Sequence, residues 1–168
     1  MSVIKKEISR QFDEIAHVYP EVKDKNCLYY QSLVRAIQEN IKSPNSPILE
    51  IGCGHGGILN KVSTVPGVGV DFSKKMVKEA TRRYKYHRFY CQELGNIRLN
   101  ETFPTILLPD VVEYIDDLDK AFANIAELLE SEGTLIVTSP NPIWFPILKL
   151  ATLFKLKMDD KFSKLPCR

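Results

Sequence analysis

The pattern of apolar positions divides the chain into an N-terminal helical part and a longer alternating part. Apolar residues recur every three or four positions over residues 3–16, which is the spacing of a helix that buries one face. A second stretch with this spacing follows Asn26, whose side chain can cap a helix. Its predicted buried side comprises Leu28, Tyr29, Leu33, Val34, Ile37 and Ile41. The proline-containing segment 43–47 then ends the helical part.

From residue 48 onward, short apolar runs alternate with helical patterns. The apolar runs predict five strands, at residues 48–51, 67–71, 87–91, 105–108 and 134–138. Helical spacing predicts helices at residues 58–65 and 73–84, and a third that Asp117 caps and that runs through Leu129 to stop near Gly133. Strands separated by helices indicate a parallel sheet with helices on both faces. The sequence therefore predicts an α/β fold.

The first predicted strand leads directly into a glycine-rich segment. Residues 48–57 read Ile-Leu-Glu-Ile-Gly-Cys-Gly-His-Gly-Gly. Glycines allow a sharp backbone turn and let a ligand approach without a Cβ in the way. The helix that follows offers free N–H groups to a polar or anionic ligand. We therefore expect the glycine turn, Gly52–Gly57, to cradle a ligand rather than to serve as an ordinary tight turn.

Two classes of cofactor compete for this turn. Gly52, Gly54 and Gly57 satisfy the dinucleotide fingerprint, which favours NAD. Glu50 argues against NAD, because a carboxylate that points into the crevice disfavours a diphosphate and favours a ligand with an ammonium group. Asp71 ends the second strand, where a carboxylate can accept both hydroxyls of a ribose. Its alternative role is to cap the following helix.

As a set, these segments resemble the class I S-adenosylmethionine-dependent methyltransferases. Glu50–Gly56 fits that family's acid-x-Gly-x-Gly-x-Gly turn, and Asp71-Phe72-Ser73 with Met76 fits its second-strand acid and the helix after it. Segments 103–115 and 128–135 resemble its fourth strand and its turn into the fifth. Phe12-Asp13-Glu14-Ile15-Ala16, with Tyr19, resembles its N-terminal cap. The resemblance covers roughly residues 10–145.

The resemblance implies a Rossmann-like three-layer sandwich with a mostly parallel sheet in the strand order 3-2-1-4-5. Residues 143–154 form an apolar segment and residues 155–168 a charged one without alternation, so we expect the last two strands of the family to be missing. We expect one domain over residues 1–168. It comprises an N-terminal helical cap (1–42), a cofactor-binding core (47–140), and an apolar segment with a charged tail (141–168).

The resemblance also implies S-adenosylmethionine as the cofactor. The glycine turn and Glu50 would hold the methionyl end, Asp71 the ribose, Phe72 and Glu93 the adenine, and Pro109 would flank the sulfonium. The predicted cofactor-binding residues are Glu50, Gly52, Cys53, Gly54, Gly56, Asp71, Phe72, Ser73, Met76, Glu93, Leu94 and Pro109. Two positions depart from the family pattern, because Pro104 replaces an Asp and Tyr114 stands where many members have His.

No catalytic dyad or triad stands out in the sequence. The polar groups expected to face a methyl acceptor are Tyr19, Tyr29, Tyr30, Asp110, Glu113 and Tyr114, and the candidate catalytic residues among them are Tyr19, Tyr30, Asp110 and Tyr114. We expect methylation of a small-molecule acceptor. The alternative, motivated by the short C-terminus, is a regulatory or interaction module that binds S-adenosylmethionine and is catalytically impaired.

Composition and charge indicate which kinds of binding partner to expect. A chain of 168 residues with 44% hydrophobic and 26% charged residues is typical of one globular domain. The net charge is only +2, and the basic residues between 74 and 88 surround a predicted surface helix, so no nucleic-acid partner is expected. His55 and His87 have no partners at metal spacing, so no metal is assigned.

Cysteine spacing and the apolar segment bear on the compartment. The four cysteines are widely separated, which favours a reduced, cytoplasmic chain. Segment 143–154 contains Pro146 and Lys149 and is shorter than a membrane span, so no stable membrane insertion is expected. A fifth strand without its family neighbours is an edge strand. We therefore expect self-association through residues 134–138 or the segment around Trp144, or Trp144 folded over that edge.

Overall fold

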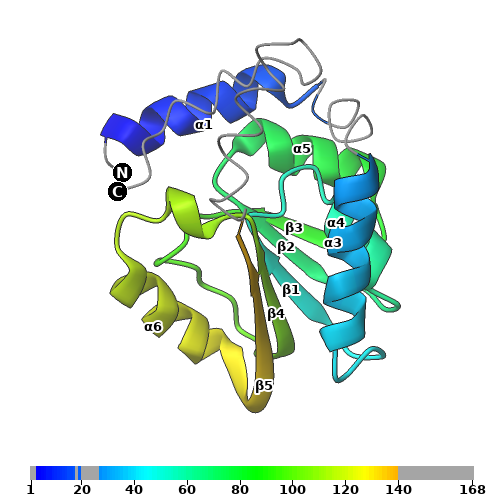
Figure 1. Ribbon diagram of the computed structural model, residues 1–168. Helices are drawn as coiled ribbons and strands as arrows, with labels where there is room; N and C mark the ends of the chain where they lie inside the picture. Colours follow the sequence, from blue (N-terminus) through cyan, green and yellow to red (C-terminus); the bar gives the residue numbers. More distant parts are fainter. Residues whose placement is uncertain (1–2, 18, 20–26, 140–168) are drawn as a thin grey trace.

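Five parallel strands form the single sheet in the computed structural model, which describes residues 3–17, 19 and 27–139. The strand order is β3-β2-β1-β4-β5 (Figure 1), which confirms the predicted α/β fold and order. The strands are β1 (Ile48–Ile51), β2 (Val68–Asp71), β3 (Arg88–Cys91), β4 (Phe103–Pro109) and β5 (Leu129–Thr138). All four strand pairs within it are parallel.

The predicted helices are present with shifted ends. They are α1 (Val3–Ile15), α3 (Cys27–Asn40), α4 (Gly57–Val62), α5 (Lys74–Arg83) and α6 (Leu118–Leu128). A short 3₁₀ helix that was not predicted, η1 (Val112–Tyr114), follows β4. Ser73 and Asp117 are the N-caps of α5 and α6, since each side chain accepts a hydrogen bond from the N–H three residues on. No helix in the described ranges is long and apolar enough to span a bilayer.

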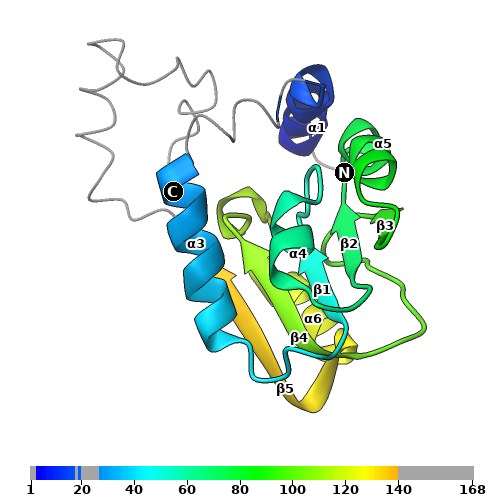
Figure 2. The ribbon, with the colours of Figure 1, turned by 90° about the vertical axis from the view of Figure 1, so that its right-hand side faces the viewer.

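Side chains that alternate along the central strands build two cores. Leu49 and Ile51 of β1 pack in a cluster with residues of α6, whereas Ile48 packs in a cluster with α3 and α4. Figures 1 and 2 show α6 on the face of the sheet opposite α3 and α4. This alternation points Glu50 and Asp71 toward the side of α4 and α5, near the carboxyl ends of the strands.

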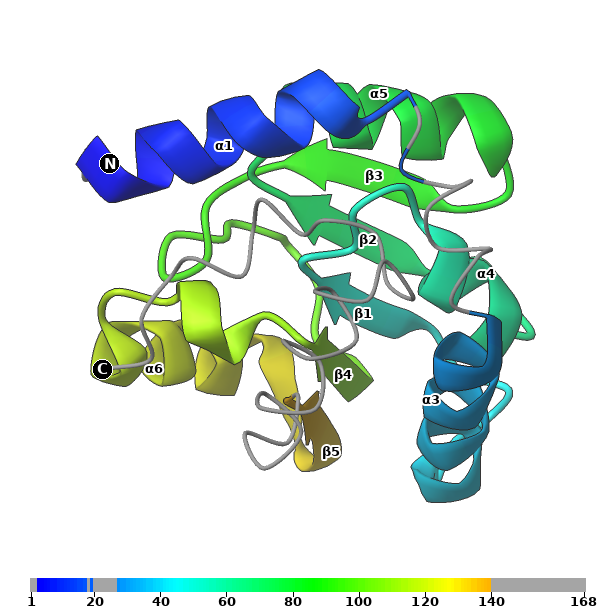
Figure 3. The same ribbon diagram turned by 45° about the horizontal axis from the view of Figure 1, so that its top comes forward.

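The carboxyl ends of β1, β2 and β4 meet at one edge of the sheet. Glu50 of β1 lies opposite Gly69 of β2 and Leu107 of β4, so the loops that follow these strands are neighbours. Helix α1 runs beside α5 at this end of the molecule (Figure 3). The loops after β1, β2 and β4, together with α1, therefore surround the candidate site.

The predicted buried side of the second helix is wrong at its first turn. Leu33 and Ile37 are buried, but Leu28 is 76% exposed and Tyr29 is 47% exposed. The first turn of α3 lies near the strand ends rather than over the middle of the sheet, as the contact of Tyr29 with the residue after β4 shows. Helical spacing alone does not show how much of a helix lies over the core.

The fifth strand begins earlier than predicted. Helix α6 ends when Leu129 adopts an extended backbone (φ −88°, ψ 135°), and β5 starts at that residue instead of at Thr134. Leu129 lies opposite Phe103, with a register irregularity between Phe103 and Thr105. Gly133 therefore lies within the strand and does not end the helix. The expectations for Asn26, Trp144, segment 141–168 and the missing last strands fall outside the described residues.

Candidate functional site

The glycine turn folds back onto the neighbouring strand. Gly52, Gly54 and Gly56 have φ values of 74°, 52° and 80°, a left-handed backbone that glycine adopts at little cost. The N–H groups of Gly52 and Cys53 both donate to the carbonyl oxygen of Val70, at 2.7 and 3.0 Å. A Cβ on Gly52 would lie 2.2 Å from Cγ2 of Val111. The first glycine is therefore required for the loop after β4 to pack against the turn.

Gly54 has a different environment. Within 4 Å, a Cβ at this position would meet only Cε1 of Tyr19, at 3.6 Å. The backbone of Gly54 thus faces the ring of Tyr19, and a Cβ would make only an ordinary van der Waals contact with it. This is the part of the turn where a ligand can approach the main chain closely.

Asp71 joins the glycine turn to helix α5. Its Oδ2 accepts a hydrogen bond from the N–H of Gly54 at 2.8 Å, and its Oδ1 accepts one from the N–H of Ser73 at 2.8 Å. The side chain is 7% exposed. Burial raises the pKa of Asp71 to about 6, while hydrogen bonds from Ser73 and Gly54 act to lower it. A further backbone hydrogen bond, from Phe72, also acts to lower this pKa. A carboxylate has about four lone-pair sites, so one remains that can accept a ligand hydroxyl.

Glu50 is almost fully buried in β1. It is 1% exposed, and its Oε2 accepts a hydrogen bond from the N–H of Leu59 at 2.9 Å. The carboxylate therefore holds the first turn of α4 beneath the glycine loop. Burial raises the pKa of the Cys53 thiol well above its usual range, with Asp71 and Glu50 adding to the effect. A protonated thiol is a poor nucleophile, so Cys53 is a packing residue of the turn.

Helix α1 covers the site with an aromatic side chain. The ring of Phe12 makes edge-to-face contacts with Tyr19, Phe72 and Tyr114, at centroid distances of 6.1, 5.9 and 5.9 Å. Sequence reasoning placed Phe12 in the N-terminal cap but gave it no role in the site. The signal that could have identified it is the phenylalanine–aspartate pair that opens this cap.

Asp13 fixes α1 to the start of α5. Its Oδ1 accepts hydrogen bonds from the hydroxyl of Ser73 and from the N–H of Lys75. Ser73 is itself the N-cap of α5 and the donor of an N–H to Asp71. One short segment thus connects the glycine turn, the second strand and the N-terminal helix. Sequence reasoning missed Asp13, because this contact joins residues 60 positions apart.

Tyr19 lies between the two strand ends that carry acidic residues. Burial raises the pKa of its phenol well above the usual range, and Tyr30, Tyr114, Asp71 and Asp110 each raise it further. The ring also contacts His55 edge-to-face at a centroid distance of 5.6 Å. A phenol held in its neutral form can donate a hydrogen bond at neutral pH but does not act as a base.

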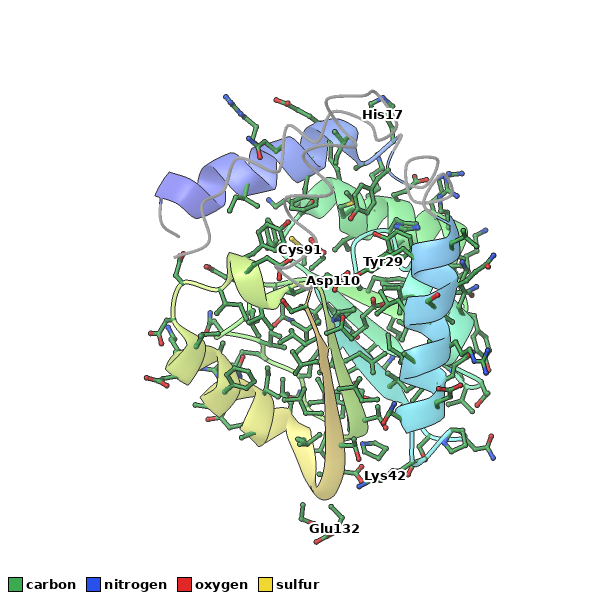
Figure 4. All side chains as sticks on the ribbon, in the orientation of Figure 1. His17, Tyr29, Lys42, Cys91, Asp110 and Glu132 are labelled. Carbon is green, nitrogen blue, oxygen red and sulfur yellow. The ribbon has the colours of Figure 1, made fainter. Side chains whose placement is uncertain are left out.

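Asp110, directly after β4, is held in a left-handed backbone conformation by hydrogen bonds to two other elements, β5 and α3. Among the residues that the structure describes, Asp110 is the one non-glycine residue with a positive φ, which is 53°. Its N–H donates to the carbonyl oxygen of Thr138 at 3.1 Å, and the Thr138 hydroxyl donates to its Oδ1 at 3.0 Å. The hydroxyl of Tyr29 donates to its Oδ2 at 2.7 Å. Figure 4 shows Tyr29 and Asp110 close together at the end of the sheet.

The remaining predicted residues divide between core and surface. Met76 and Ser73 have no exposed surface, and Pro109 is buried at the end of β4. Leu94 packs against the core cluster on the α6 side, Tyr30 packs against the cluster below α3, and Glu93 lies half-buried in the loop after β3. Burial, followed by the charge of Asp110, raises the pKa of Glu113.

The donor set fits a ligand that carries hydroxyl groups. A buried carboxylate accepts a hydrogen bond from the glycine turn, and the rings of Tyr19, Phe12 and Phe72 lie near these residues. No group of three potential metal ligands occurs among residues 3–17, 19 and 27–139. The arrangement can bind a ribose and position a ligand at the ends of β1, β2 and β4.

Comparison with known proteins gives one family. The methyltransferase domain family matches residues 42–165. The malonyl-[acyl-carrier protein] O-methyltransferase of Bacillus anthracis is 25% identical over 161 residues, which cover 92% of this chain and 59% of that protein. The ubiquinone biosynthesis O-methyltransferase of Pelagibacter ubique is 29% identical, with 83% and 66% covered. The chain thus spans less than two thirds of the length of these relatives.

Solved structures share the fold. An S-adenosylmethionine-dependent methyltransferase from Clostridium acetobutylicum is 25% identical, with a TM-score of 0.58 over 78% of this chain and 61% of that chain. The S-adenosylmethionine-bound structure of CalS10, an amino pentose methyltransferase from Micromonospora echinaspora, is 20% identical, with a TM-score of 0.64 over 73% and 56%. The second likeness supports the architecture alone.

Proposed function

Because this chain belongs to the class I S-adenosylmethionine-dependent methyltransferase family, we propose that it binds S-adenosylmethionine at the glycine turn and methylates a small molecule. The observation that carries the proposal is the hydrogen bond between Asp71 and the N–H of Gly54. It joins the two parts that sequence reasoning treated separately, the cradle and the ribose acid. Neither part alone distinguishes a ligand site from a tight turn and a helix cap.

The described residues divide the work of holding such a cofactor. Asp71 accepts a ribose hydroxyl through its remaining lone pair. The backbone at Gly54 borders the methionyl portion, and Phe72 with Phe12 borders the base. Glu50 acts indirectly, since its hydrogen bond to Leu59 sets the position of α4 and of the turn above it.

Methyl transfer from S-adenosylmethionine mainly requires the protein to align the acceptor with the methyl group. When bound, S-adenosylmethionine supplies an activated methyl group on a sulfonium. The chain's own residues have to place the acceptor in line and exclude water, and positioning of this kind supplies about 7–11 kcal/mol of barrier reduction. Helix α1, held to α5 by Asp13, and the residues after β4 are placed to form the walls of such a site.

The acceptor is proposed at the level of class. The two relatives are by name O-methyltransferases, one for malonyl-[acyl-carrier protein] and one in ubiquinone biosynthesis. A structural neighbour methylates an amino pentose. These names support a small-molecule acceptor for this chain. They do not define its charge, because the named acceptors differ chemically from one another.

Calorimetry with three ligands tests the proposal. We expect saturable binding of S-adenosylmethionine and S-adenosylhomocysteine and no binding of NAD. Asp71→Asn is expected to weaken binding by about 1.5–3 kcal/mol, the scale of hydrogen bonds to a charged group. Asp119→Asn, which removes an exposed carboxylate on α6, is the control and should bind like the parent. Equal affinity in the folded Asp71→Asn chain would remove Asp71 from the site.

Turnover is measured separately, as S-adenosylhomocysteine released with a panel of hydroxyl, amine and carboxylate acceptors. Cofactor binding without turnover on any of them would favour a module that binds S-adenosylmethionine without methylating. Tight binding of NAD would favour the dinucleotide alternative instead.

A further inference from the structure

The carboxylate of Asp110 is oriented by hydroxyl groups from two other elements. Thr138 of β5 donates to Oδ1 and Tyr29 of α3 donates to Oδ2. The two donors fix the plane of the group, so its remaining lone pairs point in set directions. Asp110 thus presents an oriented carboxylate at the end of β4.

This carboxylate lies against the cofactor cradle. Val111, the next residue, fills the space beside Gly52, where a Cβ would lie 2.2 Å from its Cγ2. The ring of Tyr29 is 47% exposed. Its hydroxyl oxygen keeps lone pairs after it donates to Asp110. Tyr29 and Asp110 are therefore neighbours of the glycine turn, at the start of α3 and the end of β4.

Among the residues that the structure describes, a second acidic side chain lies near Asp110, and no ion pair involves either of the two. Glu113, three residues on, is near enough for Asp110 to raise its pKa. The charge that an acceptor meets on this side is therefore uncompensated among the described residues. A carboxylate placed here is repelled, while an ammonium or hydroxyl group finds acceptors.

We propose that Tyr29 and Asp110 recognise the methyl acceptor and select one that donates a hydrogen bond from an amine or hydroxyl group, against carboxylate acceptors. The inference rests on the proposed function, because it assigns the acceptor side of that site. It separates this chain from the malonyl-[acyl-carrier protein] relative, which by its name acts on a malonyl group.

Three probes of one shape and different charge test the proposal. Benzylamine, benzyl alcohol and benzoate share a phenyl ring and differ in the polar group that would meet Tyr29 and Asp110. Each is titrated at pH 7 into the full chain saturated with S-adenosylhomocysteine, and binding is followed by calorimetry or by ligand-detected NMR. We expect benzylamine to bind most tightly, benzyl alcohol next, and benzoate most weakly.

Two variants identify the residues responsible. Asp110→Asn retains the size of the side chain and tolerates a positive φ, and Tyr29→Phe removes one hydroxyl. We expect Asp110→Asn to weaken benzylamine about 10- to 100-fold, the loss of a hydrogen bond to a charged group, and to strengthen benzoate. Tyr29→Phe should weaken benzylamine and benzyl alcohol. Asp119→Asn and Tyr86→Phe, at exposed positions elsewhere, are the matched controls and should preserve the parent's order.

The order of the probes decides the outcome. A purely structural role for the pair predicts that the variants weaken all three probes equally, and that result would overturn the proposal. So would benzoate binding as tightly as benzylamine, or no saturable binding of any probe to the parent. S-adenosylhomocysteine binding in the same experiment reports on the proposed function independently, because Tyr29 lies on the acceptor side and its variant should keep that affinity.

Discussion

Asp71 determines how the stability of the folded chain should depend on pH. Burial raises the pKa of its carboxyl from 3.8 to about 6, so the folded chain holds this proton more tightly than the unfolded chain does. Between those two values the folded state binds more protons than the unfolded state. The free energy of unfolding therefore decreases as pH rises through this window, and the loss is essentially complete above about pH 7.

The size of the effect follows from the two pKa values. Between pH 4 and pH 7, titration of Asp71 lowers the free energy of unfolding by about 2 kcal/mol. The side chain of Asp71→Asn cannot ionise, so the free energy of unfolding of this variant does not fall with pH in this way. Loss of a hydrogen bond destabilises the variant by about 1–3 kcal/mol at every pH, because its amide nitrogen leaves the N–H of Gly54 or Ser73 without an acceptor. The variant is thus less stable at pH 4, and the gap narrows by about 2 kcal/mol toward pH 7.

Urea unfolding of the parent and the variant at pH 4, 5, 6 and 7 measures this gap. Taking the difference cancels other titrating groups, such as His87, whose pKa burial lowers. Glu79→Gln is the control of opposite sign. A hydrogen bond from Arg82 lowers the pKa of Glu79 to about 2, so ionised Glu79 stabilises the fold and the deficit of its variant should widen as pH rises from 4. A gap for Asp71→Asn that stays constant or widens would refute the reasoning.

Four further outcomes are expected. Gly54→Val should lower the thermal midpoint and abolish binding of S-adenosylhomocysteine. The φ angle at this position is 52°, and a left-handed backbone costs a branched residue about 1–2 kcal/mol. A variant that melts and binds like the parent would contradict this expectation. Affinity for S-adenosylhomocysteine should fall as pH drops below about 6, where Asp71 becomes protonated, and a flat calorimetric pH profile would speak against the ribose role. Asp13→Ala should make α1 more sensitive to limited proteolysis, since two hydrogen bonds to α5 are lost, and an unchanged cleavage rate would argue against that attachment. Val137 is 41% exposed on β5, beside a groove of about 390 Å³ between that strand and α3. We expect the chain to self-associate through this edge, so light scattering should show a smaller species for Val137→Lys. A monomeric parent would exclude self-association.

Local patterns in the sequence were enough to predict the helices and strands and the glycine turn. Alternation of apolar runs with helical spacing is enough to predict a parallel sheet, because each strand and helix must bury its own apolar side. The glycine turn and the cap at Ser73 were likewise readable, since positive φ and N-cap preferences belong to individual residues. The strand order 3-2-1-4-5 came from family resemblance and is confirmed by the structure.

Tertiary contacts decided the rest of the site. The bond from Tyr29 to Asp110 joins residues 81 positions apart, and the bond from Ser73 to Asp13 joins residues 60 apart. No local pattern encodes such pairs, because they arise only when packing of α1 and α3 brings their ends to the same edge of the sheet. The sequence by itself thus determined which elements form and which turn is the candidate ligand site. Packing decided which polar groups meet at that turn, how far each is buried, and hence the pKa of Asp71.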